Sequence, residues 1–594
     1  MQELDYPFDS RVVRRKKLSL KRKLLEQEGL MDKKIAVLGG STTAEIKDML
    51  ELFLLNEGIR PSFFESEYAQ YWQDAVFGNE ELKALKPDII FIHTTSRNIS
   101  EYPELSDPEE EISRKLDRER ERFQRMWDQL SQDYSCPIIQ NNFEYPPFRL
   151  LGNLEAADPH GRVNFISRLN ACFAEYARHH SSFYLNDINY QAAEYGLDRW
   201  HDLSVWYLYK YALSLEAIPF LAFQVSNIIK SIFGRNKKAL ALDLDNTLWG
   251  GVVGDDGPEN LELGPETGLG EAYLEFQAYL KELSKCGILL TVISKNDEEN
   301  ALAGLSHPQM VLKSKDFISV TANWEPKSEN LKKTAQSLNL LPESFVFVDD
   351  NPAEREIVRQ QVSGAGIPEL SHVEGYIAAL DRAGYFEATT LSGDDLKRSE
   401  MYRENAKRAE LQASFSDYGE YLASLEMKAE IKPFSPVYMA RIAQLTNKSN
   451  QFNLTTRRYT EEEIRMASAE KDTVTLYGAL ADRFGDNGVV SVVIAREEGE
   501  ALRIILWLMS CRVLKRGMED AMMDELVRIA VKRGKVRLIG EYIPTQKNRM
   551  VKDFYPGMGF VQTAGAEDGS AEYELTGLSG YEKKNRFIRV NEGA

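Results

Sequence analysis

One short stretch constrains the fold of this chain more than any other. Residues 239–248 read ALALDLDNTL, an apolar strand that ends in Asp243 and is followed by Asp245 and Thr247 at alternate positions. In a parallel α/β sheet, the carboxyl ends of the strands form the ligand crevice. The two carboxylates therefore leave the strand where chemistry is expected.

Three further motifs follow along the chain, and each places polar residues at the end of a strand or at the start of a helix. A second apolar strand, ILLTVIS, ends in Ser294, and Lys327 opens a helix in WEPKSEN. A third strand, FVFVDD, ends in the adjacent acids Asp349 and Asp350. Because parallel strands end at the same edge of a sheet, we expect these four points to converge on one site.

The alternation of strands and helices also predicts the domain organisation. The chain has 594 residues, which corresponds to three or four domains at about 150 residues each. Parallel α/β patterns indicate one domain over 31–233 and a second over 234–390, which contains the stretch described above. A basic helix over 1–30 precedes them. A helical connector over 391–427 leads to an α+β domain over 428–594.

The charge balance and the cysteines exclude several classes of protein. Lys and Arg number 73 and Asp and Glu number 92, so the net charge of -19 repels a phosphate backbone and disfavours nucleic-acid binding. The four cysteines form no CxxC pair, and no stretch approaches the roughly 18 apolar residues of a membrane span. The N-terminus lacks the apolar core of a signal peptide. We therefore expect a cytoplasmic protein that does not bind membranes.

The four motifs, in this order, resemble those of the haloacid dehalogenase (HAD) superfamily of phosphotransferases. The resemblance implies that Asp243 attacks phosphorus and forms an aspartyl phosphate, while Asp245 protonates the leaving oxygen and then activates water. Ser294 and Lys327 would hold the transferring phosphoryl group. The alternative is that these acids merely cap or solvate the strand ends. The resemblance also implies an Mg²⁺ site, with ligands from Asp243, the backbone carbonyl of Asp245, Asp349 and Asp350.

The spacing of these motifs predicts a HAD domain of the Rossmann-like type without a cap domain. Thr247 and Ser294 are separated only by a glycine-rich flap and one helix, and the interval from Ser294 to Lys327 is equally short. Such an open site requires a bulky or carrier-tethered substrate, or cover from neighbouring domains. Ser294 has an alternative role, because a serine before Lys-Asn could cap the next helix.

Four segments resemble the FkbH-like family more closely than HAD enzymes in general. They are the flap WGGVVGDDG at 249–257, VDDNPAERE at 348–356, RIAQLTNKSNQFNLTTRRY at 441–459 and DRFGDNG at 482–488. The resemblance implies an enzyme of natural-product or polysaccharide biosynthesis. It would take a glyceryl unit from a phosphorylated donor such as 1,3-bisphosphoglycerate, remove phosphate and load the unit onto an acyl carrier protein. Some members pass the acyl group through a cysteine of their own, and none can be assigned here.

Blocks of the first α/β domain resemble the SGNH esterases, which implies a flavodoxin-type sheet. Ser41 follows a strand and two glycines, Asn98 follows DIIFIHTT, and Asp198 and His201 precede a helix. The resemblance implies that Ser41 attacks an ester, His201 takes its proton, Asp198 orients the imidazole and Asn98 holds the oxyanion. Ser96 stands where the third block usually has glycine. The alternative is a degenerate scaffold that recognises the substrate or the carrier.

The third domain resembles the N-acetyltransferase (GNAT) fold, with RVLKRG in the place of its pyrophosphate loop. Lys515 replaces the first glycine of that loop, so we expect a carrier's phosphopantetheine arm to be favoured over acetyl-CoA. Ordinary CoA use and a purely structural role are the alternatives. The resemblance implies a site of Arg512, Lys515, Arg516, Gly517, Asn548 and Tyr555, in which the tyrosine protonates the departing thiolate.

The N-terminal helix and the overall function each leave alternatives open. Residues 11–23, RVVRRKKLSLKRK, hold eight basic and no acidic residues. They form either a solvated helix packed by its leucines or a docking face for an acidic carrier, made by Arg14, Arg15, Lys21, Arg22 and Lys23. For the whole chain, the alternatives to glyceryl loading are a phosphatase fused to an N-acetyltransferase that modifies an amino sugar and a non-enzymatic carrier-binding scaffold.

Overall fold

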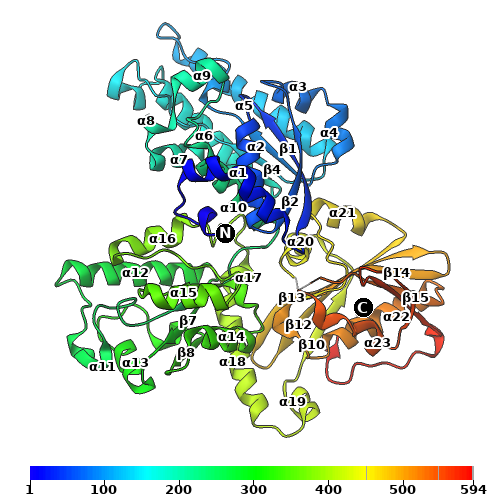
Figure 1. The fold of residues 1–594 in the computed structure, drawn as a ribbon. Coiled ribbons are helices and arrows are strands. Elements are labelled where there is room, and N and C mark those ends of the chain that lie inside the picture. Colours follow the sequence, from blue (N-terminus) through cyan, green and yellow to red (C-terminus); the bar gives the residue numbers. More distant parts are fainter. Residues whose placement is uncertain (450, 546, 592–594) are drawn as a thin grey trace. The chain divides into compact units, whose positions relative to one another are not determined.

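The computed structural model describes residues 1–449, 451–545 and 547–591 and is a multidomain α/β protein (Figure 1). It divides into two compact units, Met1–Ile232 with Thr460–Glu463, and Phe233–Tyr459 with Ile464–Ala594. Asn450, within one of the family-like segments, lies outside the described residues, as do the last three residues of the predicted C-terminal domain.

The first unit contains a five-stranded parallel sheet in the order β2-β1-β3-β4-β5, the flavodoxin-type order predicted from the sequence. Phe123 and Trp127 of α5 (Glu109–Asp133) and Phe165 of α6 (Arg162–His179) pack on one face of the sheet. The strands are β1 (Met31–Gly39), β2 (Ile59–Glu65), β3 (Ile89–His93), β4 (Ile138–Asn141) and β5 (Phe183–Asn186).

Two features of this unit differ from the sequence prediction. The outer strands β2 and β5 are absent from that prediction, because neither has the continuous apolar run of the central strands. The sequence predicts one helical stretch from Leu203 to Phe233, whereas the structure has two helices there, α9 (Leu203–Tyr209) and α10 (Ile218–Ile232). The break follows Lys210, which has a left-handed backbone with φ of 60° and ends α9.

The second unit begins with a four-stranded parallel sheet in the order β8-β7-β6-β9. Leu240 and Leu242 pack with α12 (Gly268–Lys285) on one face, and Ala239 and Ala241 pack with α14 and α15 on the other. The elements are β6 (Ala239–Leu242), β7 (Leu289–Ser294), β8 (Ser319–Ala322), β9 (Phe345–Val348), α14 (Lys327–Ser337) and α15 (Pro352–Gln361).

No cap domain interrupts this sheet in the described part of the chain. Between Thr247 and Ser294 the chain forms only the one-turn helix α11 (Val253–Asp256), a 3-10 turn and α12. This confirms the predicted capless HAD-type fold. The buried strand β6 places its carboxyl end, and the residues after it, at the open edge of the sheet.

The C-terminal sheet follows the order β16-β17-β15-β14-β13-β12-β10-β18 and is mostly antiparallel. β14 and β15 are parallel, and α22 (Met518–Lys532) connects them, which is the GNAT-like arrangement predicted from the sequence. The strands are β10 (Lys428–Lys432), β12 (Thr473–Asp482), β13 (Gly485–Glu498), β14 (Ala501–Met509), β15 (Arg537–Tyr542), β16 (Val561–Gly565), β17 (Ala571–Thr576) and β18 (Arg589–Val590).

Three connector helices, α17 (Gly393–Leu396), α18 (Arg398–Ala413) and α19 (Tyr418–Ser424), precede this sheet. Arg408 of α18 is 2% exposed and donates to both carboxylate oxygens of the fully buried Asp482, at 2.8 and 2.7 Å. A bidentate pair of this kind fixes both distance and orientation. It therefore attaches α18 to the end of β12.

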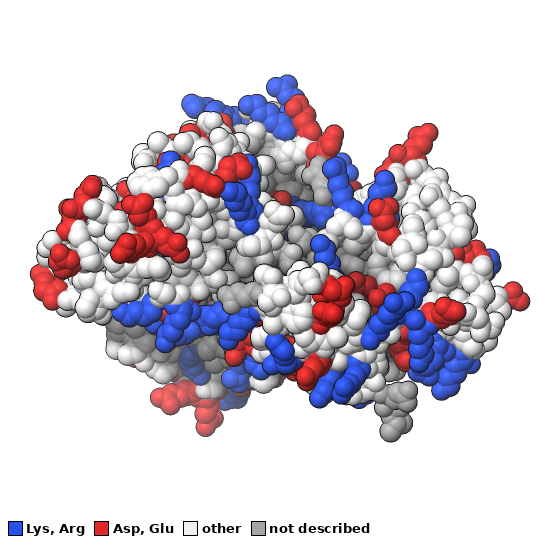
Figure 2. Space-filling view, turned by 90° about the horizontal axis from the view of Figure 1, so that it is seen from below, with Lys and Arg blue, Asp and Glu red and all other residues white. Residues whose placement is uncertain are grey.

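The surface carries both signs of charge on the face drawn in Figure 2. Lys and Arg side chains lie among Asp and Glu side chains there, rather than forming one broad basic face. Within residues 1–449, 451–545 and 547–591, no helix is both long enough and apolar enough to cross a bilayer.

The Arg408 pair predicts a stability effect. Replacing Arg408 with Ala leaves the buried Asp482 carboxylate with one ion-pair partner among the described residues, Arg516 at 3.2 Å, and with the backbone N–H groups of Phe484 and Gly485. Removing one member of a buried ion pair typically destabilises a protein by about 3–5 kcal/mol. We expect a lower unfolding temperature in scanning calorimetry, with a smaller loss for Arg408→Lys, which keeps the charge. An unfolding temperature equal to that of the parent protein would contradict the role given to this pair.

Candidate active site

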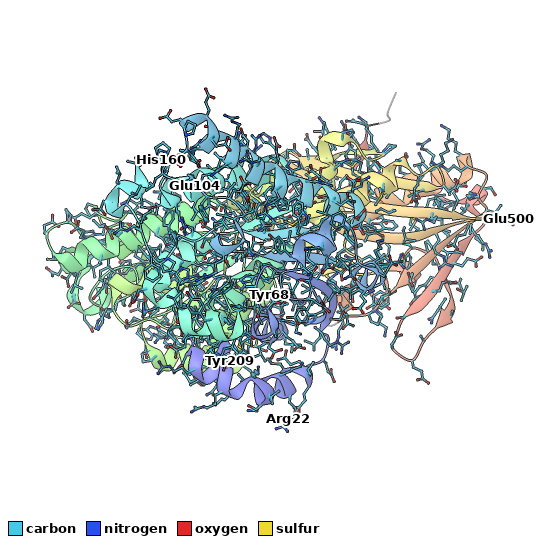
Figure 3. The ribbon with its side chains drawn as sticks, turned by 90° about the horizontal axis from the view of Figure 1, so that it is seen from above. Arg22, Tyr68, Glu104, His160, Tyr209 and Glu500 are labelled. Carbon is cyan, nitrogen blue, oxygen red and sulfur yellow. The ribbon has the colours of Figure 1, made fainter. Side chains whose placement is uncertain are left out.

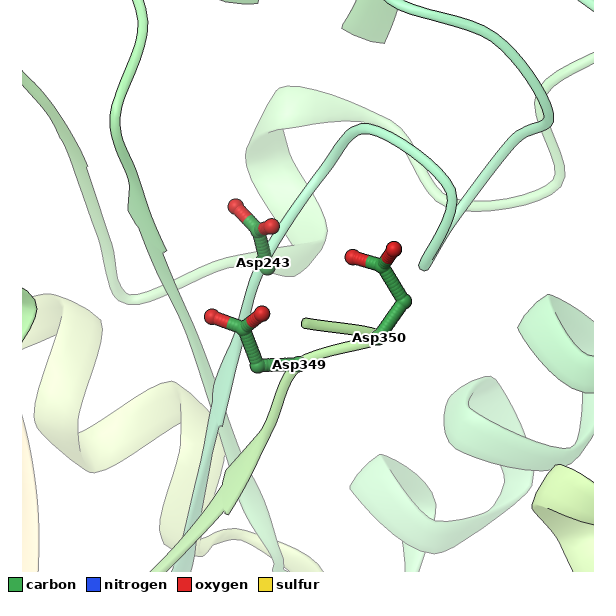
Figure 4. A group of neighbouring side chains, drawn as sticks. All are labelled: Asp243, Asp349 and Asp350. Carbon is green, nitrogen blue, oxygen red and sulfur yellow. The ribbon is translucent and has the colours of Figure 1, made fainter. Parts of the chain in front are cut away.

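Three carboxylates meet at the carboxyl edge of the four-stranded sheet. Asp243 follows β6, and Asp349 and Asp350 follow β9, which lies next to β6 in the sheet. One oxygen from each lies within 4.8 Å of the others, and the carboxyl groups point to the same side of the strand ends (Figure 4). The acids that the sequence placed at two strand ends therefore form one cluster.

Lys327 joins two of these acids. Its Nζ lies 2.9 Å from Asp243 Oδ2 and 2.6 Å from Asp349 Oδ2. Lys327 is the first residue of α14 and is 4% exposed. Because its ammonium donates to both carboxylates, the start of α14 is held at the ends of β6 and β9.

The cluster keeps an excess of negative charge, which shifts its pKa values. Burial, followed by the charge of Asp243, raises the pKa of Asp349 to about 6 against the lowering effect of Lys327. Burial is also the main cause that raises the pKa of Asp350. Three carboxylates against one ammonium favour a divalent cation. Asp243 Oδ1 is buried and has no hydrogen-bond partner among the described residues, so it is available as a ligand or a nucleophile.

Asp245 points to a different set of partners. Its Oδ1 accepts hydrogen bonds from Trp249 Nε1 at 2.9 Å and from the backbone N–H of Val253 at 3.0 Å. Its Oδ2 accepts from Asn296 Nδ2 at 3.0 Å. Burial raises the pKa of Asp245 despite these donors. The side chain of Asp245 is thus fixed beside the cluster but is not part of it.

Ser294 ends β7 and is 1% exposed. Its backbone carbonyl accepts from the N–H of Asn323, which holds the chain before Lys327 against β7. The predicted alternative, in which Ser294 caps the next helix, is wrong, because the N-cap of α13 (Glu298–Leu305) is Asp297. The structure therefore places Ser294 at the same sheet edge as Asp243.

Sequence reasoning missed three residues that shape this site. Trp249 and Asn296 hold Asp245, and the buried Arg355 donates to the backbone carbonyls of Asp349 and Asp350 at 2.8 Å each. Each lies inside a family-like segment or directly after Ser294. The only sequence signal was their nearness to a motif, which does not reveal what they contact.

The SGNH-like residues of the first unit are not joined into a relay. Ser41 follows β1 and is 2% exposed, and its Oγ has no hydrogen-bond partner among the residues described. The Asn98 amide donates to the carbonyl of Gly40 at 2.8 Å and accepts from the N–H of Thr95. The amide is therefore held by the turn after β1.

His201 and Asp198 also do not contact each other through a hydrogen bond in the described chain. His201 Nε2 lies 3.2 Å from the carbonyl of Tyr145, whereas its buried Nδ1 has no partner in the described chain. Asp198 is exposed on the one-turn helix α8 (Leu197–Trp200), and no hydrogen bond links it to His201 within the described residues. The arrangement predicted for an esterase is therefore not formed in this structure.

The same sheet edge carries a buried network outside the predicted site residues. His93 Nδ1 lies 2.9 Å from Asn141 Nδ2, Asn186 donates to Asn141, and Gln191 donates to Asn186. Burial lowers the pKa of His93 to about 4 and raises that of Glu144 to about 7. These groups are neutral or weakly charged at pH 7, unlike the acid cluster of the second unit.

The predicted pyrophosphate loop of the third domain uses its basic side chains internally. Arg516 lies 3.2 Å from Asp482 and donates to Asn405 Oδ1 at 2.6 Å. Arg512 donates to Ser510 Oγ at 3.2 Å and lies 3.8 Å from Asp394. These arginines are therefore not turned towards a ligand in this conformation.

Lys515, Gly517 and Tyr555 complete the predicted site of this domain. Lys515 has a left-handed φ of 63°, and its carbonyl accepts from Tyr418 of α19 at 2.6 Å. Gly517, with φ of 80°, is the N-cap of α22. Tyr555 is 1% exposed, its hydroxyl has no partner among the described residues, and burial raises its pKa.

A short strand of the chain occupies the edge of β14 where β15 diverges. β15 pairs with β14 only from Ala501 to Ile504, and farther along the same edge β11 (Phe452–Asn453) pairs with Leu508 and Met509. The next residue, Leu454, donates to the carbonyl of Trp507 at 3.0 Å and accepts from the N–H of Ile543 at 2.9 Å. β11 thus bridges the opening between the two strands.

A free strand edge offers unpaired N–H and C=O groups, and β11 pairs with those of β14 at this opening. Asn548 holds β11 there. It is fully buried, and its Nδ2 donates to the carbonyls of Asn453 and Ile543 at 2.9 Å each. In this structure the chain's own segment pairs with that part of the β14 edge.

The fold and the acid–lysine site define a capless phosphatase-like protein of the HAD type. Residues 34–230 match the family model described as FkbH, N-terminal domain. The chain is also similar to the N-terminal part of the protein BF1531 from Bacteroides fragilis, which contains a phosphatase domain complexed with Mg. The two are 29% identical with a TM-score of 0.58, over 63% of this chain and 99% of that chain. Residues 34–230 are therefore FkbH-like, which agrees with the resemblance predicted from the sequence.

Weaker similarities connect the chain to N-acetyltransferases. The ribosomal-protein-S18-alanine N-acetyltransferase from Escherichia coli is 13% identical, with a TM-score of 0.21, over 27% of this chain and 99% of that chain. Ard1 from Thermoplasma volcanium is 21% identical, with a TM-score of 0.20, over 25% and 94%. The fold of the third domain is therefore assigned from its own strand order. No curated protein sequence matches the chain.

The contacts of Asn548 predict a local effect on β11. Asn548→Ala removes two donors to buried carbonyls and the acceptor for the N–H of Thr545. Leaving such groups unpaired costs about 1–3 kcal/mol each. We expect faster amide hydrogen exchange at residues 452–455, measured by mass spectrometry, with β12 unchanged as the internal control. Equal exchange at 452–455 in both proteins would show that Asn548 does not hold β11.

Proposed function

We propose that this chain is a Mg²⁺-dependent enzyme that removes phosphate from a phosphorylated three-carbon acyl donor and loads the glyceryl unit onto an acyl carrier protein. The observation that carries the proposal is the cluster of Asp243, Asp349 and Asp350 with Lys327, at the open edge of a capless sheet in an FkbH-like chain. The acceptor and donor rest on the family resemblance.

The acid cluster fits Mg²⁺. Carboxylate oxygens are the hard ligands that this ion prefers, and Asp243, Asp349 and Asp350 offer three within 4.8 Å of one another. These side chains would hold the ion, with the backbone carbonyl of Asp245 as a further ligand. When bound, the ion would neutralise charge between the attacking carboxylate and the phosphoryl group.

In the proposed reaction, Asp243 attacks phosphorus. Lys327 engages only Oδ2, so the unpartnered Oδ1 is the atom left for the reaction. The Oδ1–P bond forms as the bond from phosphorus to the substrate oxygen breaks. Asp245 gives its proton to the departing oxygen, and then takes a proton from the water that hydrolyses the aspartyl phosphate.

The contacts of Asp245 suit these two roles. A carboxyl group whose pKa is raised by burial keeps a proton more readily for the leaving oxygen. Trp249, Val253 and Asn296 limit its rotation and hold it beside Asp243. Ser294 and Lys327 would contact the oxygens of the transferring phosphoryl group.

A donor of the 1,3-bisphosphoglycerate class carries both groups that the proposed reaction needs, an acyl phosphate at C1 for acyl transfer and a phosphate ester at C3 for hydrolysis. The thiol of a carrier arm attacks C1 of the acyl phosphate, a C–S bond forms, and the C1 phosphate leaves with the thiol proton taken up by solvent or by that phosphate. No other energy source is needed. The C3 phosphate ester is hydrolysed by water at Asp243. An open site without a cap accommodates a substrate that is tethered to a carrier.

The role of Asp243 is tested by Asp243→Asn. An amide cannot form the phosphoenzyme and weakens the ligand set, so we expect phosphate release to fall by roughly 10³-fold or more. Free phosphate is measured with Mg²⁺ and the glycerate phosphate donor. Asp381→Asn, an exposed acid of the same sheet domain, is the matched control and should retain activity. Turnover by Asp243→Asn within tenfold of the parent protein would exclude Asp243 as the nucleophile.

The carrier part of the proposal is tested by intact-mass analysis of holo carrier proteins incubated with this protein, Mg²⁺ and 1,3-bisphosphoglycerate. We expect a carrier whose mass increases by one glyceryl unit, and no increase after chelation of Mg²⁺. Free phosphate without any loaded carrier would favour a phosphatase fused to an acetyltransferase-like domain. The absence of both products would favour a non-enzymatic scaffold.

A further inference from the structure

The N-terminal helix α1 (Ser10–Leu25) has a buried face that explains its attachment to the first unit. Val13, Leu20 and Leu24 are exposed by no more than 2%. Their spacing of seven and four residues places them on one side of a helix with 3.6 residues per turn. The helix packs against α2 (Ala44–Asn56) along this side.

Part of the basic charge of α1 is used within the protein. Lys17 lies 2.8 Å from both Glu45 and Asp48 of α2, and Lys21 lies 2.6 Å from Glu51. Arg14 lies 3.3 Å from Glu45. The predicted docking face is therefore corrected: Arg14 and Lys21 belong to the internal contact between two helices.

A second stripe of side chains lies on the opposite side of α1. Arg15, Leu18, Arg22 and Leu25 follow one another at intervals of three, four and three residues, which keeps them on one helix face. We call these four residues the outer stripe. Leu18 is 78% exposed and Leu25 is 42% exposed. Figure 3 shows Arg22 pointing outward from the helix.

The arginines of the outer stripe are not neutralised by the protein. Arg15 and Arg22 are exposed, and neither forms an ion pair among the described residues. Each is next to an exposed leucine on the same face. A purely solvated face has no need of two leucines at helical spacing, whereas a helix that contacts another helix commonly combines apolar contacts with flanking charges.

The geometry points to a docking surface, and we propose that the outer stripe binds an acidic, amphipathic helix of the acyl carrier protein. The stripe spans eleven residues, from Arg15 to Leu25, and about 15 Å along the helix axis, which suits one face of a partner helix of about three turns. The partner's carboxylates would pair with Arg15 and Arg22, and its apolar side chains would cover Leu18 and Leu25. This identification of the partner rests on the proposed function.

The local charge of the stripe is compatible with the acidic chain as a whole. The net charge of the chain is -19, but charges farther than about 8 Å are largely screened at physiological ionic strength. The acids of α2 face the other side of α1 and are already paired with Arg14, Lys17 and Lys21. The acids of α2 would therefore not face a helix that approaches the stripe, and the acid nearest to the stripe in the sequence is the exposed Glu26 at the end of α1.

The test compares stripe variants with a charge-matched control. The probe is the fluorescently labelled holo carrier protein that accepts the glyceryl unit in the mass analysis, and binding is measured by anisotropy at 50 mM and 500 mM salt. We expect Arg15→Glu/Arg22→Glu to weaken binding about tenfold or more at 50 mM salt, with Arg22→Glu between this variant and the parent protein. Arg125→Glu, on the exposed face of α5, makes the same charge change as Arg22→Glu and should bind as the parent does.

Leu18→Ser tests the apolar half of the surface. We expect several-fold weaker binding that depends little on salt, because a buried apolar contact is lost rather than a charge. Phosphate release from the small donor should be unchanged in every stripe variant, since none of these residues lies in the acid–lysine site. Circular dichroism checks that α1 remains folded.

The outcomes separate this inference from the proposed function. If the stripe variants bind and load the carrier as well as the parent and Arg125→Glu do, the outer stripe is not the docking surface, and the proposed function stands. If the parent protein releases phosphate but loads no holo carrier, both the carrier function and the assigned partner are overturned. Loss of binding and loading confined to the stripe variants supports the inference.

Discussion

A single ammonium group holds together the candidate active site of this protein. Two buried carboxylates on neighbouring strands repel each other, and burial alone would favour their protonated forms. Lys327 lies between Asp243 and Asp349 and donates to both. Because it is also the first residue of α14, this one contact ties a helix start to two strand ends. The negative charge that Lys327 leaves over would favour a divalent cation over a neutral ligand.

The two parallel sheets of the chain put their polar residues at the same kind of edge but with opposite electrostatics. At the edge of the four-stranded sheet in the second unit, three carboxylates face one ammonium group, so negative charge is in excess. In the first unit, His93, Asn141, Asn186 and Gln191 satisfy one another through hydrogen bonds. A shared architecture therefore supplies a position for chemistry, and the residues at the strand ends decide whether charge is available there.

The sequence is most informative where buried parallel strands end. The apolar runs before Asp243 and Asp349 stop at these acids, so the runs themselves predict that both acids lie at strand ends. The contacts of Asp245 with Trp249 and Asn296 depend on the path of the flap, which no local pattern determines.

Long-range pairing explains the other differences. β11 has only two residues, and its strand conformation comes from β14, more than fifty positions later in the chain. Asp198 and His201 have the right order in the sequence. However, a one-turn helix directs the acid to the surface, and order alone does not bring two side chains together.

Because β11 pairs with the edge of β14, a ligand that pairs with the same part of that edge would have to compete with a segment of the chain itself. A ligand that needs the β14 edge can bind only the fraction of molecules in which β11 has moved away, so its apparent dissociation constant is the intrinsic one divided by that fraction. The segment is covalently attached, so its effective concentration at the edge does not fall on dilution. A tethered donor, held nearby by a separate contact, would compete on more equal terms than a free small molecule.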